Sequence, residues 1–306
     1  MLPLDGLVVL NLTRLLPGDA TVGMLASFGA GIVPLKLPEV DLKTPAGKAI
    51  LLERLERADV LIESFRPGVM RRFGLDYETL RARNPRLIYV AITGFGQTGQ
   101  WSGMAGHDVN YLSLAGVLDV TGVKDGCPVI PGVQIADLAG GAMSAVIGIL
   151  LALEARRRTG CGQMVDVSMH QGSLWMMAIP FLLQASGRAT ARGDAFITGR
   201  YACYHLYEAA DGRWLAVGAL EQKFWVNLCR ELGCEEFIAD QFTEGPRRQE
   251  IIEGVAAIFR TRPAAEWFER LEGCDACVTP VRSVAEVVRE FGGKVPVIPR
   301  LGGVEE

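Results

Sequence analysis

The sequence is poor in histidine and lacks the short motifs that mark several large enzyme classes. No GxGxxG motif opens a helix after the first apolar run and no P-loop is present, so a nucleotide cofactor held by a glycine-rich loop is not expected. A GxSxG elbow is missing as well, which argues against a hydrolase of the serine-triad type. The chemistry of this chain must therefore rest on other residues.

The chain has no excess of positive charge, and its cysteines do not have the pattern of a disulfide framework. The 306 residues carry a net charge of -4 and a pI near 5.6, so a nucleic-acid partner is not expected. The seven cysteines are odd in number and scattered. The single CxxC, from Cys274 to Cys277, has no further ligands nearby for a metal. This usage is typical of reduced thiols in a cytoplasmic protein without a metal site.

Long hydrophobic runs and targeting signals are also scarce. The first residues, Met1 to Asp5, contain no basic segment of the kind that opens a secretory signal. The most apolar run, residues 138–153, is short for a membrane span and rich in glycine and alanine. We therefore expect a cytoplasmic protein that has no membrane partner.

Short apolar runs alternate with helical patterns over the first half of the chain. The runs expected to be strands are residues 7–12, 32–35, 60–62, 87–92 and 164–168. Helices are expected at residues 17–27, from the Thr44-Pro45 start signal onward, and after Asp76, which can cap a helix. This alternation predicts an α/β fold whose parallel sheet is covered on both faces. Ligands of such sheets bind in the loops beyond the carboxyl ends of the strands.

A change in composition near residue 188 indicates a second domain. Residues 188–199 are expected to be a linker after a large domain of residues 1–187. Beyond it, two apolar runs flank Asp211 and Gly212, which is a strong signal for a β-hairpin. Helical patterns follow, so residues 200–282 are expected to form a small α+β domain. Residues 283–306 would then be a C-terminal tail.

His107 is the first candidate for chemistry because only three histidines occur in the chain. It follows a glycine in a loop-like stretch after the fourth predicted strand. A free imidazole has a pKa near 6.5, so it can accept or donate a proton at neutral pH.

Two acidic residues have competing interpretations. Asp137 precedes the apolar helix of residues 138–153, and from spacing alone helix capping is the favoured interpretation. A carboxylate beside the N–H groups of a helix start can also serve in catalysis. Glu221 is more often a first-turn glutamate that complements the helix dipole. The basic residues near Arg66 and Arg72 fit either a solvated surface or a phosphate contact.

Several segments together resemble the family III CoA-transferases, and within that family the α-methylacyl-CoA racemases. The resemblance covers most of the chain, from Leu4 to about Val281. The segments that carry it include IESFRPG from Ile62, TGFGQTG from Thr93, GHDVNY from Gly106, ADLAGG from Ala136 and VGALE from Val217. Each is weak alone, whereas the combination is specific.

The resemblance implies a Rossmann-like large domain completed by the C-terminal tail, a small domain between them, and an interlocked homodimer. It implies a coenzyme A thioester as substrate and no separate cofactor. His107 and Asp137 would be the acid–base pair, with Glu221 near His107. The positions that match the family's CoA contacts are Val40, Asp41, Leu42, Lys43, Ser64, Phe65, Arg66, Arg72, Gly106, Asp108, Asn110 and Tyr111.

These residue types suit the reaction that the resemblance implies. Inverting the α-carbon of a 2-methylacyl-CoA requires removal of a proton beside the thioester carbonyl and its return on the opposite face. Two bases can do this, one on each side of a planar enolate. A free aspartate has a pKa of about 3.9, so the site must raise the pKa of Asp137. Glu221 would orient the imidazole, and N–H groups at the start of the following helix would bind the enolate oxygen.

The chain also departs from the family, and two alternatives stay open. Relatives carry a longer basic segment with an Arg-Pro where this chain has Leu37 and Pro38. This predicts weakened or rearranged CoA binding. One alternative is a CoA-transferase, in which Asp137 attacks a thioester and carries the acyl group. The other is a non-catalytic relative that binds CoA esters.

Overall fold

A computed structural model describes residues 1–36, 40–188 and 190–294. The shortened segment at Leu37 and Pro38 lies outside these residues, as do residues 295–306 of the expected C-terminal tail. The chain forms two compact units. The first contains Met1–Asp119 and Val129–Leu182, and the second contains Val120–Pro128 and the described residues from Leu183 onward. The expected linker and the first residues of the expected tail therefore fall within the second unit.

The first unit is built on a five-stranded parallel sheet, as the alternating pattern predicts. Its strands are β1 (Val8–Asn11), β2 (Gly31–Pro34), β3 (Val60–Glu63), β4 (Ile88–Thr93) and β5 (Met164–Ser168). Their order is β2-β1-β3-β4-β5. The chain passes from β1 to β2 on one side of β1 and then from β2 to β3 on its other side. This reversal creates a switch point between β1 and β3, where ligands of open α/β sheets bind.

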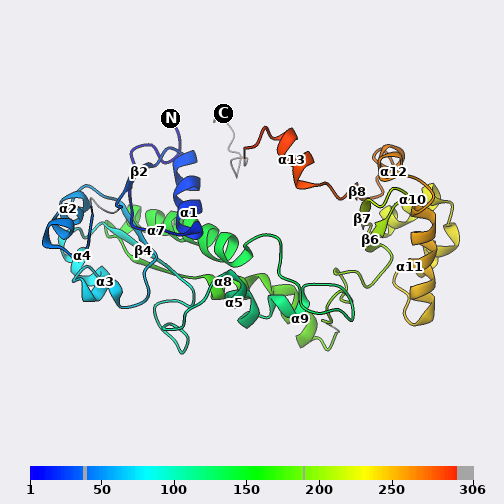
Figure 1. Ribbon diagram of the computed structural model, residues 1–306, viewed down its shortest axis with the longest axis horizontal. Coiled ribbons are helices and arrows are strands. Elements are labelled where there is room, and N and C mark those ends of the chain that lie inside the picture. The colour runs from blue at the N-terminus through cyan, green and yellow to red at the C-terminus, as the bar shows by residue number, and fades with distance from the viewer. Residues whose placement is uncertain (37–39, 189, 295–306) are drawn as a thin grey trace. The chain divides into compact units, whose positions relative to one another are not determined.

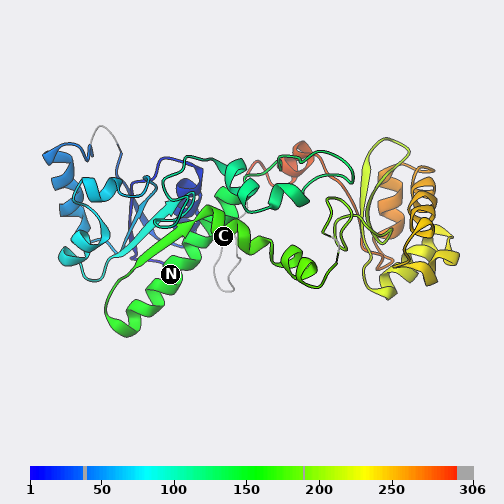
Figure 2. The same cartoon turned by 90° about the horizontal axis from the view of Figure 1, so that it is seen from below.

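Helices cover both faces of this sheet because its central strands are apolar on both sides. One face carries α2 (Pro45–Leu55), α3 (Val69–Arg72) and α4 (Tyr77–Arg83), and the other carries α1 (Leu16–Ser27) and α7 (Ser144–Thr159) (Figure 1). Both predicted caps are confirmed: Thr44 Oγ1 accepts the Gly47 N–H at 3.0 Å, and Asp76 Oδ1 accepts the Thr79 N–H at 3.1 Å. Figure 2 shows α7 running beside β5.

The long apolar helix begins differently from the prediction. A π-helical segment, η1 (Ala136–Met143), precedes α7, and the chain is already helical at Ile135, with φ -66° and ψ -45°. Asp137 therefore lies inside the first turn, and its interpretation as an N-cap is wrong. The continuous helix, Ala136–Thr159, is longer than the apolar run suggested. With a mean hydropathy of 1.9 in its most apolar window, it is long and apolar enough to cross a membrane. A core helix passes the same test, and residues such as Ala145 and Ile149 are fully buried.

The apolar segment that follows β5 forms two helices. They are α8 (Met169–Met176) and α9 (Ala178–Ala185), which meet at Met177. Pro180 lies in the first turn of α9, where its missing N–H leaves no intrahelical bond unmade. Two short helices, α5 (Asp108–Leu114) and α6 (Val117–Val120), precede the crossing into the second unit.

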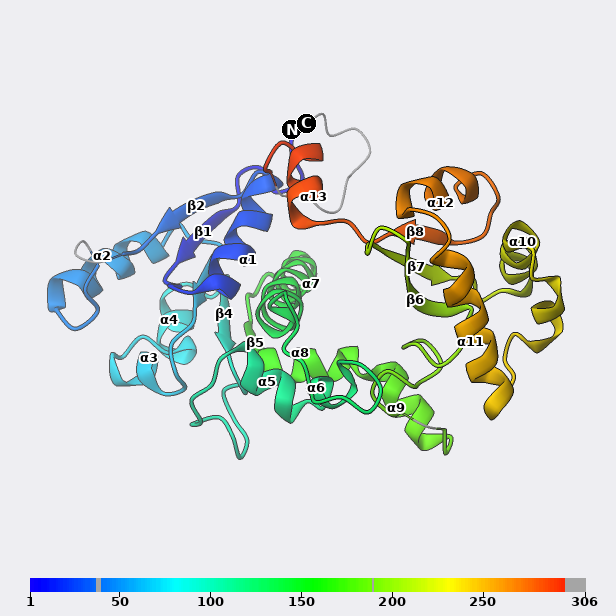
Figure 3. The ribbon, with the colours of Figure 1, turned by 45° about the vertical axis from the view of Figure 1, so that its right-hand side comes forward.

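The second unit contains the predicted hairpin and one strand that the prediction omitted. Strands β6 (Tyr204–Glu208) and β7 (Trp214–Gly218) are antiparallel, and β8 (Val278–Pro280) adds to β7. Helices lie beside this sheet, which Figure 3 shows with α11 and α12. The helical elements of the unit are α10 (Gln222–Leu232), η2 (Glu235–Asp240), α11 (Pro246–Phe259), α12 (Ala264–Leu271) and α13 (Val284–Glu290). Its core is aromatic, with Trp225, Tyr207 and Phe259 almost fully buried.

Candidate functional site

A cavity of about 460 Å³ lies at the carboxyl ends of β1, β3 and β4, all within the first unit. The turn after β1 contributes Leu15, and the turn after β3 contributes Phe65 and Arg66. The opposite wall contains His107 and Tyr111. The structure therefore brings two groups of predicted site residues, far apart in the sequence, around one cavity at the position expected for an α/β sheet.

His107 is the residue that immediately precedes α5. Its backbone is extended, with φ -126° and ψ 179°, and its N–H donates to Asn110 Oδ1 at 3.1 Å. The side chain is exposed. The following turn is fixed by Tyr111, whose hydroxyl donates to the Gly106 carbonyl. Gly94 allows this arrangement, because a Cβ there would lie 2.4 Å from the Tyr111 ring. His107 thus stands at a defined helix start rather than in an irregular loop.

Asp137 is connected to the same segment through its backbone. Its N–H donates to Asp108 Oδ1 at 2.9 Å, and Asp108 is the residue after His107. Burial raises the pKa of the Asp137 carboxyl and the nearby Asp108 carboxylate raises it further, while His107 opposes both. A raised pKa makes a carboxylate a better base, which is the direction that proton transfer requires.

The start of the helix does not provide the donors expected for an enolate oxygen. The Asp137 N–H is bonded to Asp108, and the Leu138 N–H is bonded to the Gln134 carbonyl at 3.0 Å. Neither of these two N–H groups is therefore open to an enolate oxygen in this structure. Because η1 starts before Asp137, the N–H groups of Asp137 and Leu138 already donate to acceptors within the protein.

Close helix packing holds Asp137 in place. Gly140 in η1 and Gly172 in α8 face each other so closely that a Cβ on Gly172 would lie 2.4 Å from the Gly140 Cα. Glycine at both positions lets the two helices approach backbone to backbone. The glycines of the ADLAGG segment thus have a packing role that spacing alone did not reveal.

The predicted CoA-contacting residues fall into two groups. Ser64, Phe65 and Arg66 line the cavity, together with Gly106, Asn110 and Tyr111. The second group comprises Val40, Asp41, Leu42, Lys43, Arg72 and Asp108, which are not part of the described lining. Val40 and Leu42 are buried in the core beneath α2, so neither offers an exposed side chain to a ligand.

Arg14 is a residue that the sequence reading missed. It follows β1, and its guanidinium lies over the Phe65 ring, 5.9 Å from the centroid. Arg14 and Arg66 are both exposed, whereas Phe65 is half-buried. A cation over an aromatic face beside the cavity adds positive charge where an anionic ligand would bind. Its only sequence signal is a lone basic residue after the first strand.

Glu221 lies in the second unit, so the structure does not place it beside His107 and Asp137. It occupies the N-cap position of α10 but makes no side-chain capping bond, and it is exposed. Its negative charge contributes to the raised pKa of the Cys277 thiol, after burial and Asp275. Among the residues that the structure describes, no cluster of three His, Cys, Asp or Glu side chains has the arrangement of a metal site.

Comparisons with known proteins identify the family. The model of CoA-transferase family III matches residues 36–292. The chain belongs to CoA-transferase family III. This is a family of enzymes that includes both CoA-transferases and racemases.

The relatives within CoA-transferase family III include racemases and transferases. The chain is 37% identical to an alpha-methylacyl-CoA racemase of Homo sapiens, over 95% of this chain and 81% of the relative. It is 32% identical to an acetyl-CoA:oxalate CoA-transferase of Acetobacter aceti, over 93% and 82%. The crystal structure of a CAIB/BAIF family protein from Brucella suis is similar, with a TM-score of 0.79 and 28% identity, over 94% of this chain and 86% of that one.

Proposed function

We propose that the protein is an acyl-CoA racemase or epimerase that inverts the α-carbon of a 2-methylacyl-CoA. The observation that carries this proposal is the bond from the Asp137 N–H to Asp108, the residue next to His107, which brings a carboxyl group of raised pKa near the imidazole. Asp137 is within electrostatic range of His107, and a backbone bond to Asp108 ties the two segments together. The racemase relatives support the same choice.

The proposed reaction is a 1,1-proton transfer. One of the two side chains removes the α-proton, and the electron pair of the C–H bond moves into the thioester carbonyl to form an enolate. The other side chain then donates a proton to the opposite face, and the carbonyl is restored. Because Asp137 and His107 exchange roles with the direction of reaction, each must be able to hold the proton that it receives. The raised pKa of Asp137 makes its carboxylate a stronger base for this step.

The substrate's CoA portion would bind along the turn after β3. Arg66 and Arg14 offer positive charge there, beside Phe65. No separate cofactor is needed, because the thioester itself makes the α-proton acidic. We propose that the remaining predicted contacts, residues 40–43 and Arg72, act at the outer part of the CoA molecule.

We further propose that two chains form an interlocked homodimer in the cytoplasm, without membrane or nucleic-acid partners. Exposed apolar side chains on α7 support the dimer, since Ile147 and Leu151 are 59% and 65% exposed. Phe181 and Leu182 on α9 are also more than half exposed. Apolar patches of this kind mark interaction surfaces. In the assembled dimer, Glu221 would orient the imidazole of His107.

A CoA-transferase is the second candidate. In this reaction the Asp137 carboxylate attacks the thioester, CoA leaves, and the acyl group is held as a mixed anhydride. The transferase relatives favour this alternative. A non-catalytic CoA-ester binder is the third candidate, and the shortened sequence before Val40 is its main support.

One experiment separates the three candidates. The protein is incubated in D2O with one enantiomer of 2-methylbutanoyl-CoA, with and without an acceptor carboxylic acid. The racemase predicts α-deuterium and loss of optical purity without any acceptor. Transfer of CoA to the acceptor without α-deuterium would replace the proposal with the transferase. Binding without either reaction would leave the non-catalytic binder.

A further inference from the structure

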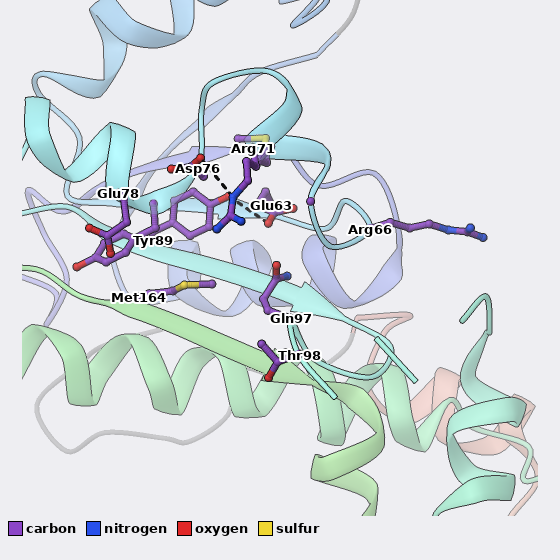
Figure 4. Close-up of a pocket in the computed structure, with 12 residues that line it drawn as sticks. Glu63, Arg66, Arg71, Asp76, Glu78, Tyr89, Gln97, Thr98 and Met164 are labelled. Atoms are coloured by element: carbon purple, nitrogen blue, oxygen red, sulfur yellow. Dashed lines mark hydrogen bonds and ion pairs between the residues drawn. The ribbon is translucent and has the colours of Figure 1, made fainter. Parts of the chain in front are cut away.

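Glu63 is a buried carboxylate directly behind the wall of the site. It is the last residue of β3, and only 3% of it is exposed. Its Oε2 accepts the Phe65 N–H at 2.6 Å, and its Oε1 accepts the Tyr89 hydroxyl at 3.2 Å. Tyr89 belongs to the neighbouring strand β4 and is also buried. Figure 4 shows the pair side by side. One side chain therefore ties the turn after β3 to the adjacent strand.

The turn of residues 64–68 separates two cavities. On one side lies the site cavity of about 460 Å³, and on the other lies a cavity of about 390 Å³ that contains Glu63 and Tyr89. Arg66 borders both, and in Figure 4 its side chain extends away from Glu63 and Tyr89. Its positive charge acts on Tyr111 in the opposite wall of the site. The direction in which the turn leaves β3 thus determines where Phe65 and Arg66 stand.

A carboxylate is a costly choice for this buried position. Burial raises the pKa of Glu63 to about 7, despite the bonds from Phe65 and Tyr89 that lower it. An apolar side chain of similar volume would avoid this cost. An apolar side chain would only fill the space. Glu63 also accepts two hydrogen bonds in fixed directions, and these bonds set the path of the turn after β3.

We infer that Glu63, held by Tyr89, is a positioning residue for CoA-ester binding: it orients the 64–68 turn so that Phe65 and Arg66 face the substrate. The inference rests on the proposed function, since it assigns this turn to the CoA ester. It concerns affinity rather than proton transfer, because Glu63 lies behind the turn and does not reach the reacting carbon.

The test measures stability and affinity in the same variants. Glu63→Leu fills a similar volume but removes both acceptors, and Glu63→Gln keeps an acceptor for Phe65 and an amide for Tyr89. Tyr89→Phe removes one of the two bonds with little change in volume. The matched control is Asp59→Asn, which alters a partly buried carboxylate at the opposite, amino end of β3. The dissociation constant of isobutyryl-CoA is measured by calorimetry and the melting temperature by circular dichroism.

Loss of two hydrogen bonds predicts that Glu63→Leu weakens isobutyryl-CoA binding about tenfold or more. It should also lower the melting temperature, because the Tyr89 hydroxyl and the Phe65 N–H lose their acceptor. Tyr89→Phe should weaken binding by about fivefold, and Glu63→Gln by less than about threefold. Asp59→Asn should lower the melting temperature and leave the dissociation constant unchanged. In turnover assays the loss in Glu63→Leu should appear in KM more than in kcat.

Two results would overturn the inference while leaving the proposed function intact. One is Glu63→Leu binding isobutyryl-CoA as tightly as the wild type. The other is a loss of affinity in Asp59→Asn that equals the loss in Glu63→Leu. A wild-type protein that binds no CoA ester would instead overturn the proposed function, and the inference with it.

Discussion

The two ends of β3 carry carboxylates in opposite settings. Asp59, at the amino end, accepts the Val8 N–H at 2.9 Å and forms an ion pair at 2.9 Å with Arg156, whose side chain is 9% exposed. Glu63, at the carboxyl end, is bonded to an amide and a phenol, both neutral. The carboxylate at the amino end is paired with a cation, whereas the hydrogen-bond partners of Glu63 at the carboxyl end carry no charge.

We infer from this difference that the amino end of β3 serves stability and the carboxyl end serves the proposed site. The Asp59–Arg156 pair joins the start of β3 to α7 and satisfies groups that burial would otherwise penalise. At the other end, the buried Glu63 carboxyl group has only neutral hydrogen-bond partners, and Gly94 lies close to the Tyr111 ring. Both features lie in or beside the turns that carry the proposed site. Local features that cost stability gather where ligands bind an α/β sheet.

The largest expected effect concerns catalysis at the carboxyl end. His107→Gln and Asp137→Asn should each lower the rate of α-carbon inversion by about a thousandfold, because each removes one of two proton-transfer groups. The dissociation constant of isobutyryl-CoA should change little. The measurement is polarimetry of one enantiomer of 2-methylbutanoyl-CoA. Inversion at an undiminished rate in either variant would remove that residue from the mechanism.

The second effect concerns the amino end. Asp59→Ala leaves the Arg156 guanidinium buried without its carboxylate, which should lower the free energy of unfolding by about 4 kcal/mol. Urea denaturation measures this change. The values of kcat and KM, determined at a temperature where the variant is folded, should match those of the wild type. A shift in KM would contradict the division of roles between the two ends.

The third effect is a pH dependence due to Glu63. Its folded pKa of about 7 lies above the unfolded value of 4.5, so the folded state holds a proton over this range. The stabilising contribution is present below pH 4.5 and is lost as the pH rises to 7, a change of about 3 kcal/mol. Glu63→Gln cannot ionise and should lack this decline. Equal pH profiles of urea stability in both proteins would refute the assignment.

The smallest expected effect comes from the helix contact that holds Asp137. Gly172→Ala places a Cβ against the Gly140 backbone and should reduce stability by about 2 kcal/mol. It should also slow inversion, since η1 must shift. Gly23→Ala in α1 is the control, because a Cβ there meets no atom within 4 Å. That control should be neutral or stabilising, by up to about 1 kcal/mol. Similar losses in both variants would argue against a special role for the close contact.

The fold was more predictable than the site. Alternating apolar runs located all five parallel strands, and local capping signals at Thr44 and Asp76 were correct because they act over three or four residues. The N-cap interpretation of Asp137 was wrong because an earlier residue, Ile135, already has helical geometry. Strand β8 carries only three residues, too few for a pattern to appear.

The site depends on contacts between distant segments, which composition and spacing do not record. The sequence singled out His107 by its scarcity and Asp137 by resemblance. It did not reveal the bond from the Asp137 N–H to Asp108, or the position of Arg14 over Phe65. Glu63 was invisible as a functional candidate because its importance comes from Tyr89 on a neighbouring strand.

The central claim is that His107 and Asp137 act on opposite faces of one α-carbon. The most direct test follows α-deuterium incorporation from D2O into each separate enantiomer of 2-methylbutanoyl-CoA, using His107→Gln and Asp137→Asn. Each variant retains one base, so each should exchange only one enantiomer, and the two variants should exchange opposite ones. Exchange of the same enantiomer by both variants, or inversion by either variant at the wild-type rate, would contradict the two-base account.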